Sequence, residues 1–225
     1  RMSVMANGGY EGAVGGWGMY PGQSFDVPTN GDGMYNSDDL FEAYNGNRSF
    51  KMWGLYWGWD DPMENQIFQE WGGDASWGHD EVPAAGSTFD LSAYLMSHNA
   101  DFIGQGNSHA KLMVKYFGDG NGGNWWDDMI LMDESTHFDG TTATADTWDN
   151  YTLSSTVPEG TWLIQLGFML VQPSNDDHGS VFVDNFVTTL TTTDCETNEF
   201  VITVDGGLYQ SEVSWTVTEH YTGAE

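Results

Sequence analysis

The chain of 225 residues is poor in cysteine and in basic residues. Its one cysteine, Cys195, cannot form an intrachain disulfide or build a cysteine-ligated zinc site. Lysine and arginine total 5 against 34 acidic residues, which gives a net charge of −29. Such a surface repels phosphate groups and anionic membranes, so we expect no nucleic-acid partner. It attracts cations, which favours a calcium-rich or saline exterior as the place where the protein works.

Long apolar runs are absent as well. No stretch approaches the roughly 18 consecutive apolar residues of a membrane helix, and the opening residues "RMSVMANGGYEG" contain no apolar signal core. We therefore expect no membrane insertion. We expect a secreted or cell-surface protein, and if the protein is exported, its signal has already been removed.

The familiar catalytic motifs are missing too. The chain contains no G-x-S-x-G, no H-E-x-x-H, no phosphate-binding glycine loop that opens a helix and no Glu-x-Asp-x-x-Glu. We predict that the protein is not an enzyme. A glycosidase pair of carboxylates about 5 to 9.5 Å apart could still form in three dimensions, with residues 127–139 as the nearest candidate segment.

Aromatic residues and glycine are abundant instead. The chain has 11 Trp, 10 Tyr and 12 Phe beside 29 Gly, a composition typical of many short strands joined by glycine turns. Helical periodicity is nearly absent, and residues 37–44 are the one segment for which we expect a short helix.

Several segments show the periodicity of β-strands. Residues 88–96 and 109–117 alternate between apolar and other side chains, and a glycine turn after the second run predicts a returning strand over residues 125–132. Residues 161–172 are apolar on both faces, as in a central strand. Residues 179–190 read as one more strand, in which Asp184 interrupts an apolar face.

The C-terminal residues form a separate unit in this interpretation. After a threonine-rich joint, the runs 200–204 and 213–217 alternate around a glycine turn and predict a hairpin. We divide the chain into a β-sandwich over residues 1–190 and a linker with a C-terminal β-hairpin over residues 191–225. Because an isolated hairpin is marginal in water, it must dock on the domain or on a neighbouring chain.

Five stretches, in order and in spacing, carry a resemblance to a known family. They are "NGGYEG" followed by Trp17, "NGNRSFKM", "NQIFQEW" with "STFDLSAYL", "TWDNYTLSSTVPEGT" and "GSVFVDNFVT". Together they resemble the jelly-roll carbohydrate-binding modules of the family 4/9 type, within the galactose-binding-like superfamily. The resemblance spans roughly residues 5 to 190 and implies an all-β fold, a two-sheet antiparallel jelly-roll β-sandwich.

The resemblance also implies a structural calcium ion near the ends of the domain. By position, Glu11, Asn47 and Asp184 would supply its side-chain oxygen ligands, together with nearby backbone carbonyls. The alternative is that Asp184 only hydrogen-bonds a turn. Residues 119–124, "DGNGGN", lack the closing Glu of an EF-hand loop, and we interpret them as a hairpin turn.

Exposed aromatic side chains are the candidate binding residues, because a flat ring can stack on the C–H face of a pyranose while Asp, Asn and Gln bind the hydroxyls. In residues 50–59 we expect Phe50 and Met52 to point into the core and the tryptophans to leave it. Trp148 and Trp162 are assigned to the core. The candidates are Trp53, Tyr56, Trp57, Trp59, Trp71, Trp125 and Trp126.

Two functions fit these features. The first is a non-catalytic extracellular module that binds a polysaccharide and holds a structural calcium ion. The alternative is a structural subunit of an extracellular filament, sheath or surface layer, which polymerises with itself through its aromatic patches and its C-terminal strands.

Overall fold

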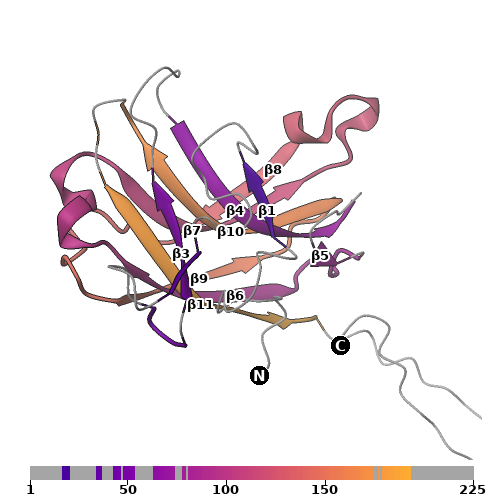
Figure 1. Ribbon diagram of the computed structural model, residues 1–225. Helices are drawn as coiled ribbons and strands as arrows, with labels where there is room; N and C mark the ends of the chain where they lie inside the picture. The colour runs from indigo at the N-terminus through magenta and orange to yellow at the C-terminus, as the bar shows by residue number, and fades with distance from the viewer. Residues whose placement is uncertain are drawn as a thin grey trace, which may run out of the picture.

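The fold is an all-β sandwich, described here from a computed structural model (Figure 1). The structure describes residues 17–20, 34–36, 43–46, 48–53, 63–73, 78–79, 81–174, 177 and 179–193. Within them lie eleven strands and four short 3-10 turns but no α-helix. None of their helical segments is long and apolar enough to cross a membrane.

Two sheets make up the sandwich. Sheet A has six strands in the order β1-β4-β10-β7-β8, with β5 also paired to β4: β1 (Gly18–Tyr20), β4 (Met63–Gly72), β5 (Gly78–His79), β7 (His109–Phe117), β8 (Met129–Glu134) and β10 (Leu163–Gln172). Sheet B has five strands in the order β2-β3-β11-β6-β9: β2 (Met34–Asn36), β3 (Arg48–Trp53), β6 (Thr88–Met96), β9 (Asp149–Thr156) and β11 (Ser180–Thr191). Every pairing is antiparallel except the short one between β4 and β5.

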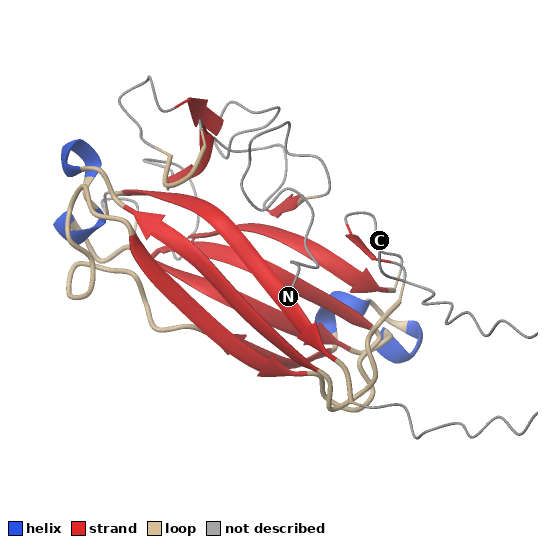
Figure 2. Ribbon diagram, turned by 90° about the horizontal axis from the view of Figure 1, so that it is seen from below, coloured by secondary structure: helices blue, strands red, loops and turns tan. Residues whose placement is uncertain are grey.

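The 3-10 turns lie at the two ends of the sandwich, whereas the strands run along its length (Figure 2). At one end are η2 (Asn99–Asp101) and η3 (Ile103–Gln105), between β6 and β7. At the other end are η4 (Gly120–Gly122) and η5 (Trp125–Asp127), between β7 and β8. The second end therefore presents a loop held between two paired strands.

Alternating side chains build the core between the sheets. On β6, Phe89, Leu91, Ala93 and Leu95 are buried while the residues between them are half-buried, as the sequence predicts. Phe50 and Met52 on β3 also point into this core, which confirms the prediction for them. The fold rests on a continuous apolar layer between two pleated surfaces.

The expected strands occur with few changes. The strands at 88–96 and 109–117 are confirmed as β6 and β7, although both faces of β7 are largely buried rather than one. The apolar run at 161–172 is β10, which lies between β4 and β7 and is buried along its whole length. The strand expected from residue 125 begins only at Met129, because η5 occupies residues 125–127.

Two predictions fall largely or wholly outside the described residues. Of the helix expected over residues 37–44, only Ala43 and Tyr44 are described, and neither is helical. The C-terminal hairpin lies wholly outside, since the described chain ends at residue 193.

The outer face of sheet A carries a second, smaller apolar cluster of Phe68, Met113, Met169 and Val171. Around it lie buried polar side chains that pair across strands. Gln165 Nε2 donates to Glu70 Oε1 at 2.8 Å, and Lys115 Nζ donates to Gln66 Oε1 at 2.9 Å. Buried polar groups need such partners, so the described side chains on this face form a packed layer.

Candidate functional site

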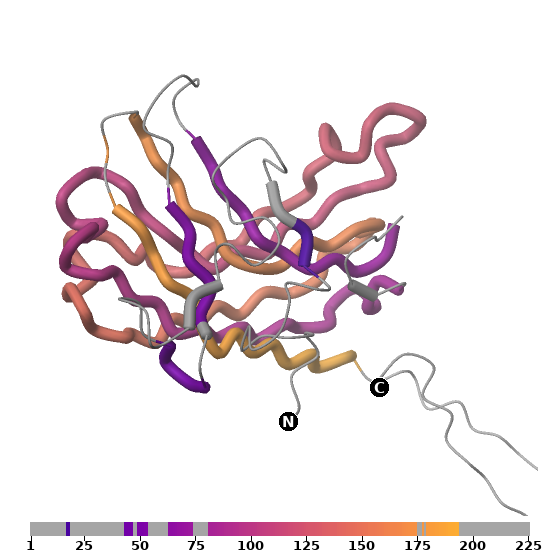
Figure 3. Tube along the Cα trace, viewed as in Figure 1, coloured from indigo at the N-terminus to yellow at the C-terminus, as the bar shows by residue number. Residues whose placement is uncertain are grey.

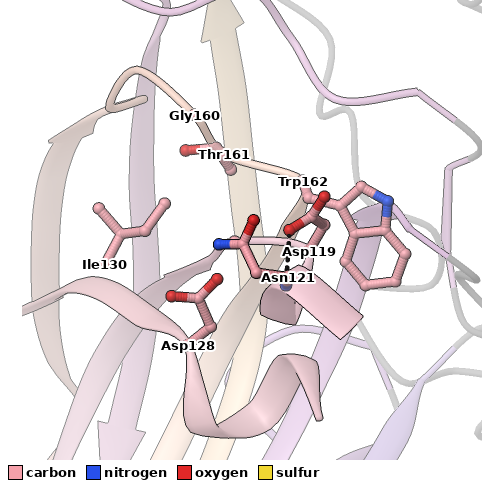
Figure 4. Close-up of a pocket in the computed structure, with 8 residues that line it drawn as sticks. Asp119, Asn121, Asp128, Ile130, Gly160, Thr161 and Trp162 are labelled. Atoms are coloured by element: carbon pink, nitrogen blue, oxygen red, sulfur yellow. Dashed lines mark hydrogen bonds between the residues drawn. The ribbon is translucent and has the colours of Figure 1, made fainter. Parts of the chain in front are cut away.

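An open pocket of roughly 410 Å³ lies at the η4–η5 end of the sandwich. Two loops form it, the one that joins β7 to β8 and the turn that leads from β9 into β10 (Figure 4). Its lining residues are Gly118, Asp119, Asn121, Asp128, Ile130, Gly160, Thr161 and Trp162. We call this the β7–β8 pocket.

The loop chemistry explains why these side chains are held in place. Asp119 caps the η4 turn, where its Oδ1 accepts the Asn121 N–H at 2.9 Å (Figure 4). Asn121 has a φ of 45°, in the left-handed region that asparagine tolerates better than most residues. Asp128 Oδ2 accepts the Gly120 N–H at 3.1 Å, and the Asp128 carbonyl accepts the Gly118 N–H at 2.9 Å. Both carboxylates are therefore fixed by backbone donors.

The pocket combines hydrogen-bonding groups with apolar walls. Figure 4 shows the Asn121 amide and the Asp128 carboxylate turned toward the same space, with the Trp162 indole beyond Asp119. Ile130 lies on the opposite side. Carboxylate and amide oxygens bind hydroxyl groups, and an indole or an aliphatic side chain packs against C–H faces. This is the chemistry that a neutral, hydroxyl-rich ring requires.

Beside the pocket, the edge strand β8 exposes apolar side chains. Met129 is 52%, Ile130 41% and Leu131 37% exposed. The register between β7 and β8 shifts at this point, so that Ile130 is an extra residue between two paired positions. With Trp126, which is 58% exposed, these residues form what we call the β8 ridge.

Trp125 and Trp126, both predicted binding residues, lie on η5 next to the pocket. Their rings meet edge to face with centroids 5.6 Å apart, and Trp125 also packs edge to face on Phe117 at 5.1 Å. Trp126 is therefore an exposed ring on a fixed support. Neither residue lines the β7–β8 pocket.

The other predicted aromatic residues have different positions. Trp53 is half-buried at the end of β3, where Lys51 Nζ lies 5.8 Å from its ring centroid. Trp71 requires a correction: it is 3% exposed, points into the core and packs edge to face on Phe89 at 5.5 Å, so its ring is not available for stacking on a sugar. Tyr56, Trp57 and Trp59 lie outside the described residues.

The assignment of Trp148 and Trp162 to the core is also corrected. Both are only half-buried. Trp162 lines the pocket, and Trp148 packs edge to face on Tyr44 on the outer side of sheet B at 6.0 Å. Each ring sits just before a strand begins, where alternation no longer fixes which face a side chain takes.

Asp184, the described member of the predicted calcium ligands, is fully buried. Its Oδ2 accepts the N–H groups of Tyr44 at 2.8 Å and Asn45 at 2.9 Å, and its Oδ1 accepts the Asn185 N–H at 2.6 Å. These bonds tie residues 44–45 to β11. No cluster of three or more His, Cys, Asp or Glu side chains suited to a metal occurs among the described residues. Glu11 and Asn47 lie outside them, so the calcium site remains a prediction.

A cluster of titratable groups on β7, on β8 and just after β8 was missed from the sequence. Lys111, which is buried, donates to Glu134 Oε2 at 2.5 Å, and Glu134 Oε1 lies 3.1 Å from His137 Nε2. The hydrogen bond from Lys111 holds the pKa of Glu134 below its usual value. His137 stacks on His109 at 4.2 Å, and burial lowers the pKa of His109. The signal in the sequence is Lys111, one of only 5 basic residues, on the same predicted strand as His109.

Comparisons with known proteins point to one fold. No protein-family model and no curated protein matches the sequence. Among solved structures, the CBM22-1-CBM22-2 tandem domain of Xyn10C from Paenibacillus barcinonensis is 17% identical, with a TM-score of 0.53 over 85% of this chain and 47% of that one. The CBM22-1-GH10 modules of endo-1,4-beta-D-xylanase 10B from Clostridium thermocellum, complexed with xylohexaose, are 14% identical, with a TM-score of 0.51 over 85% and 29%.

A family 16 carbohydrate-binding module is similar along its whole length, with 15% identity and a TM-score of 0.49 over 83% of this chain and 99% of that one. At these identities the likeness shows the fold alone. The chain has the β-sandwich fold of carbohydrate-binding modules. The more particular resemblance to the family 4/9 type remains a prediction.

Proposed function

We propose that this chain is a non-catalytic module that binds a glycan outside the cell, and that the β7–β8 pocket is its binding site. The observation that supports this proposal is the lining of the pocket, which combines the polar side chains of Asp119, Asn121 and Asp128 with the apolar side chains of Trp162 and Ile130. A pyranose would place its C–H face on the apolar walls and its hydroxyls on the carboxylates and the amide.

The fixed geometry of the pocket favours binding. Asp119 and Asp128 each accept a hydrogen bond from a backbone N–H of the same loop, which holds them as acceptors. Acceptors that are already oriented cost little entropy when a ligand arrives. The proposal assigns recognition, and no chemical step, to these residues.

Calorimetric titration with neutral oligosaccharides of glucose, xylose, galactose and mannose tests the proposal. We expect one of them to bind, and we expect Trp162→Ala and Asp128→Asn to weaken binding by at least about tenfold. Glu159→Gln is the matched control, because this exposed carboxylate lies in the adjacent turn and does not line the pocket. Absence of binding to every glycan would refute the function, and unchanged binding by both pocket variants would refute the site.

A second candidate function, self-assembly, is favoured by the β8 ridge. In the described part of sheet A, β8 pairs only with β7, and three consecutive apolar residues on it are exposed. An exposed apolar edge strand is a template for pairing with another chain. Sedimentation velocity tests this candidate: Ile130→Asp should abolish polymers, whereas Ser154→Asp on the edge strand β9 should leave them unchanged. Deletion of residues 195–225 tests the predicted strand donation in the same assay.

A further inference from the structure

Three aromatic side chains meet on the outer face of sheet B, on the other sheet from the β7–β8 pocket. The rings of Tyr44 and Tyr94 stack with centroids 3.5 Å apart and 12° between their planes. Trp148 meets Tyr44 at 6.0 Å and 61°. Tyr44 is 42% exposed, and the other two are half-buried. We call these three residues the Tyr44 platform.

The platform is held from below by Asp184. Tyr94 and Asp184 are paired across β6 and β11, and Asp184 Oδ2 accepts the backbone N–H groups of Tyr44 and Asn45. The carboxylate is fully buried, so these bonds are shielded from water. Tyr44 is thus a surface residue whose backbone is fixed by Asp184 and whose ring is fixed on one face by Tyr94. Ordering an exposed side chain in this way costs conformational entropy. An exposed ring fixed in this way loses little entropy when it is covered.

Two exposed asparagines lie beside the platform in the chain or in the sheet. Asn150 lies opposite Tyr94 in the pairing of β6 with β9, and it is exposed. Asn45, next to Tyr44, is exposed as well. An amide offers both donors and an acceptor, as hydroxyl groups require. The net charge of −29 disfavours an anionic ligand at this surface.

We propose that the Tyr44 platform is a second binding surface, for the flat face of a neutral pyranose in a glycan chain. The proposal rests on the proposed function, since it assumes that the protein binds glycans, but it does not depend on the β7–β8 pocket. In Figure 3, residues 43–46 lie below sheet B, whereas the β7–β8 loop projects at the opposite upper corner. One molecule can therefore hold two separate glycan chains.

Fluorine NMR of protein labelled with 3-fluorotyrosine reads the platform directly. The Tyr44 resonance is identified as the one that disappears in Tyr44→Phe. Titration with neutral hexasaccharides of xylose, glucose or galactose should shift this resonance in the wild type and equally in the pocket variant Trp162→Ala. Calorimetry of the same sugar should give two sites in the wild type and one in Trp162→Ala.

Tyr44→Ala should remove the remaining site of Trp162→Ala, with a loss of affinity of about tenfold or more, whereas Tyr44→Phe keeps the ring and should keep the affinity. If Tyr44→Ala unfolds, Trp148→Ala takes its place and should show the same loss of affinity. The shift of the Tyr44 resonance in the folded wild type then tests the proposal without any variant at Tyr44.

The possible failures are distinguishable. If sugars bind but never shift the Tyr44 resonance, the second surface is refuted and the pocket stands. If no sugar binds at all, both proposals fail. A Tyr44 shift that depends on protein concentration without sugar would show that a second copy of the chain covers the platform, which would overturn the proposal.

Discussion

The hydroxyl of Tyr116 on β7 lies 2.6 Å from Ser155 Oγ on β9, inside the core and across the gap between the two sheets. Ser155 Oγ in turn donates to Asp133 Oδ2 on β8 at 2.7 Å. Because the single Ser155 proton goes to the carboxylate, the Tyr116 hydroxyl must be the donor to Ser155. The two sheets are thus joined by a polar chain as well as by apolar packing.

Replacing this phenol should destabilise the protein modestly. Tyr116→Phe removes one buried hydrogen bond but leaves Ser155 paired to Asp133, so we expect a loss of about 1 kcal/mol in the free energy of unfolding at pH 7. Urea unfolding monitored by tryptophan fluorescence measures it. Ser154→Ala, which removes an exposed hydroxyl from the same strand as Ser155, is the control and should leave the free energy of unfolding unchanged.

The same residue predicts a response to alkaline pH. Burial raises the pKa of Tyr116 to about 12, whereas an unfolded tyrosine ionises near its ordinary pKa of 10.0. Between these values the unfolded state loses the proton first, so the free energy of unfolding should fall as the pH rises from 10 to 12. The free energy of unfolding of Tyr116→Phe should fall less steeply over this pH range. Parallel slopes for the variant and the wild type would contradict the raised pKa of Tyr116 as the cause.

Removing the carboxylate beside buried Lys111 should also cost stability. Glu134→Gln leaves the ammonium group with a neutral partner, and because Glu134 is partly exposed we expect a loss of roughly 1 to 2 kcal/mol at pH 7. The lowered pKa of Glu134 means that this stabilisation is present above its ordinary pKa and is lost as the pH falls. The difference in stability between the two proteins should therefore begin to shrink as the pH falls below 4.5 and should vanish once the pH is below the lowered pKa of Glu134.

Glu81→Gln, at an exposed position, is the control and should behave as the wild type. A constant difference between Glu134→Gln and the wild type down to pH 3 would show that shape rather than charge is responsible.

Gly167 allows β10 and β4 to approach closely at the centre of sheet A. A methyl group on Gly167 would lie 2.0 Å from the Ile67 carbonyl oxygen and 2.7 Å from the Phe68 Cα, both backbone atoms that cannot move aside alone. We expect Gly167→Ala to destabilise by about 3 kcal/mol, and thermal unfolding measures it.

Gly122 provides the comparison, because its surroundings are open and only its φ of +86° opposes a side chain. Gly122→Ala should cost about 1 kcal/mol. An equal or larger effect at Gly122 would mean that the approach of the two strands is not the limiting contact.

Calcium should stabilise the protein if the predicted site of Glu11, Asn47 and Asp184 forms. We expect EDTA to lower the melting temperature by several degrees and calcium to restore it, since each kcal/mol moves Tm by roughly 2 to 4 °C in a domain of this size. Magnesium serves as the control. A melting temperature that does not change with EDTA would contradict the calcium site and leave Asp184 the role of binding the backbone N–H groups of residues 44, 45 and 185.

The sequence anticipates the fold well because most strands carry clear periodicity. The alternation in residues 88–96 and the apolar run that becomes β10 place these strands within two residues of their observed bounds. Both signals arise from burial. A strand buried on one face has an apolar side chain at every second residue, and a strand buried on both faces is apolar along its length. The strand expected from residue 125 starts late because Trp125 and Trp126, apolar as they are, occupy a 3-10 turn.

The candidate site is harder to predict, because whether an aromatic side chain is exposed depends on where it lies relative to the two sheets. Trp71 and Trp162 are the same residue type, yet one is enclosed between the sheets and the other lines the pocket. Asp119 and Asn121 were visible only as turn residues. That they share a pocket with Trp162 depends on the pairing of β7 with β10, a long-range contact that local patterns do not encode.

The described lysines have a consequence for how copies of this protein meet in solution. Lys111 is buried, and Lys51 and Lys115 are half-buried. With a net charge of −29, the protein therefore presents a surface that is almost entirely negative. Such particles repel each other over a range of about 30 Å at 0.01 M salt and about 8 Å at 0.15 M. Added salt should therefore promote contact between copies while leaving attraction to an uncharged sugar nearly unchanged. The dependence on ionic strength therefore distinguishes association between copies of the protein from binding to a neutral sugar.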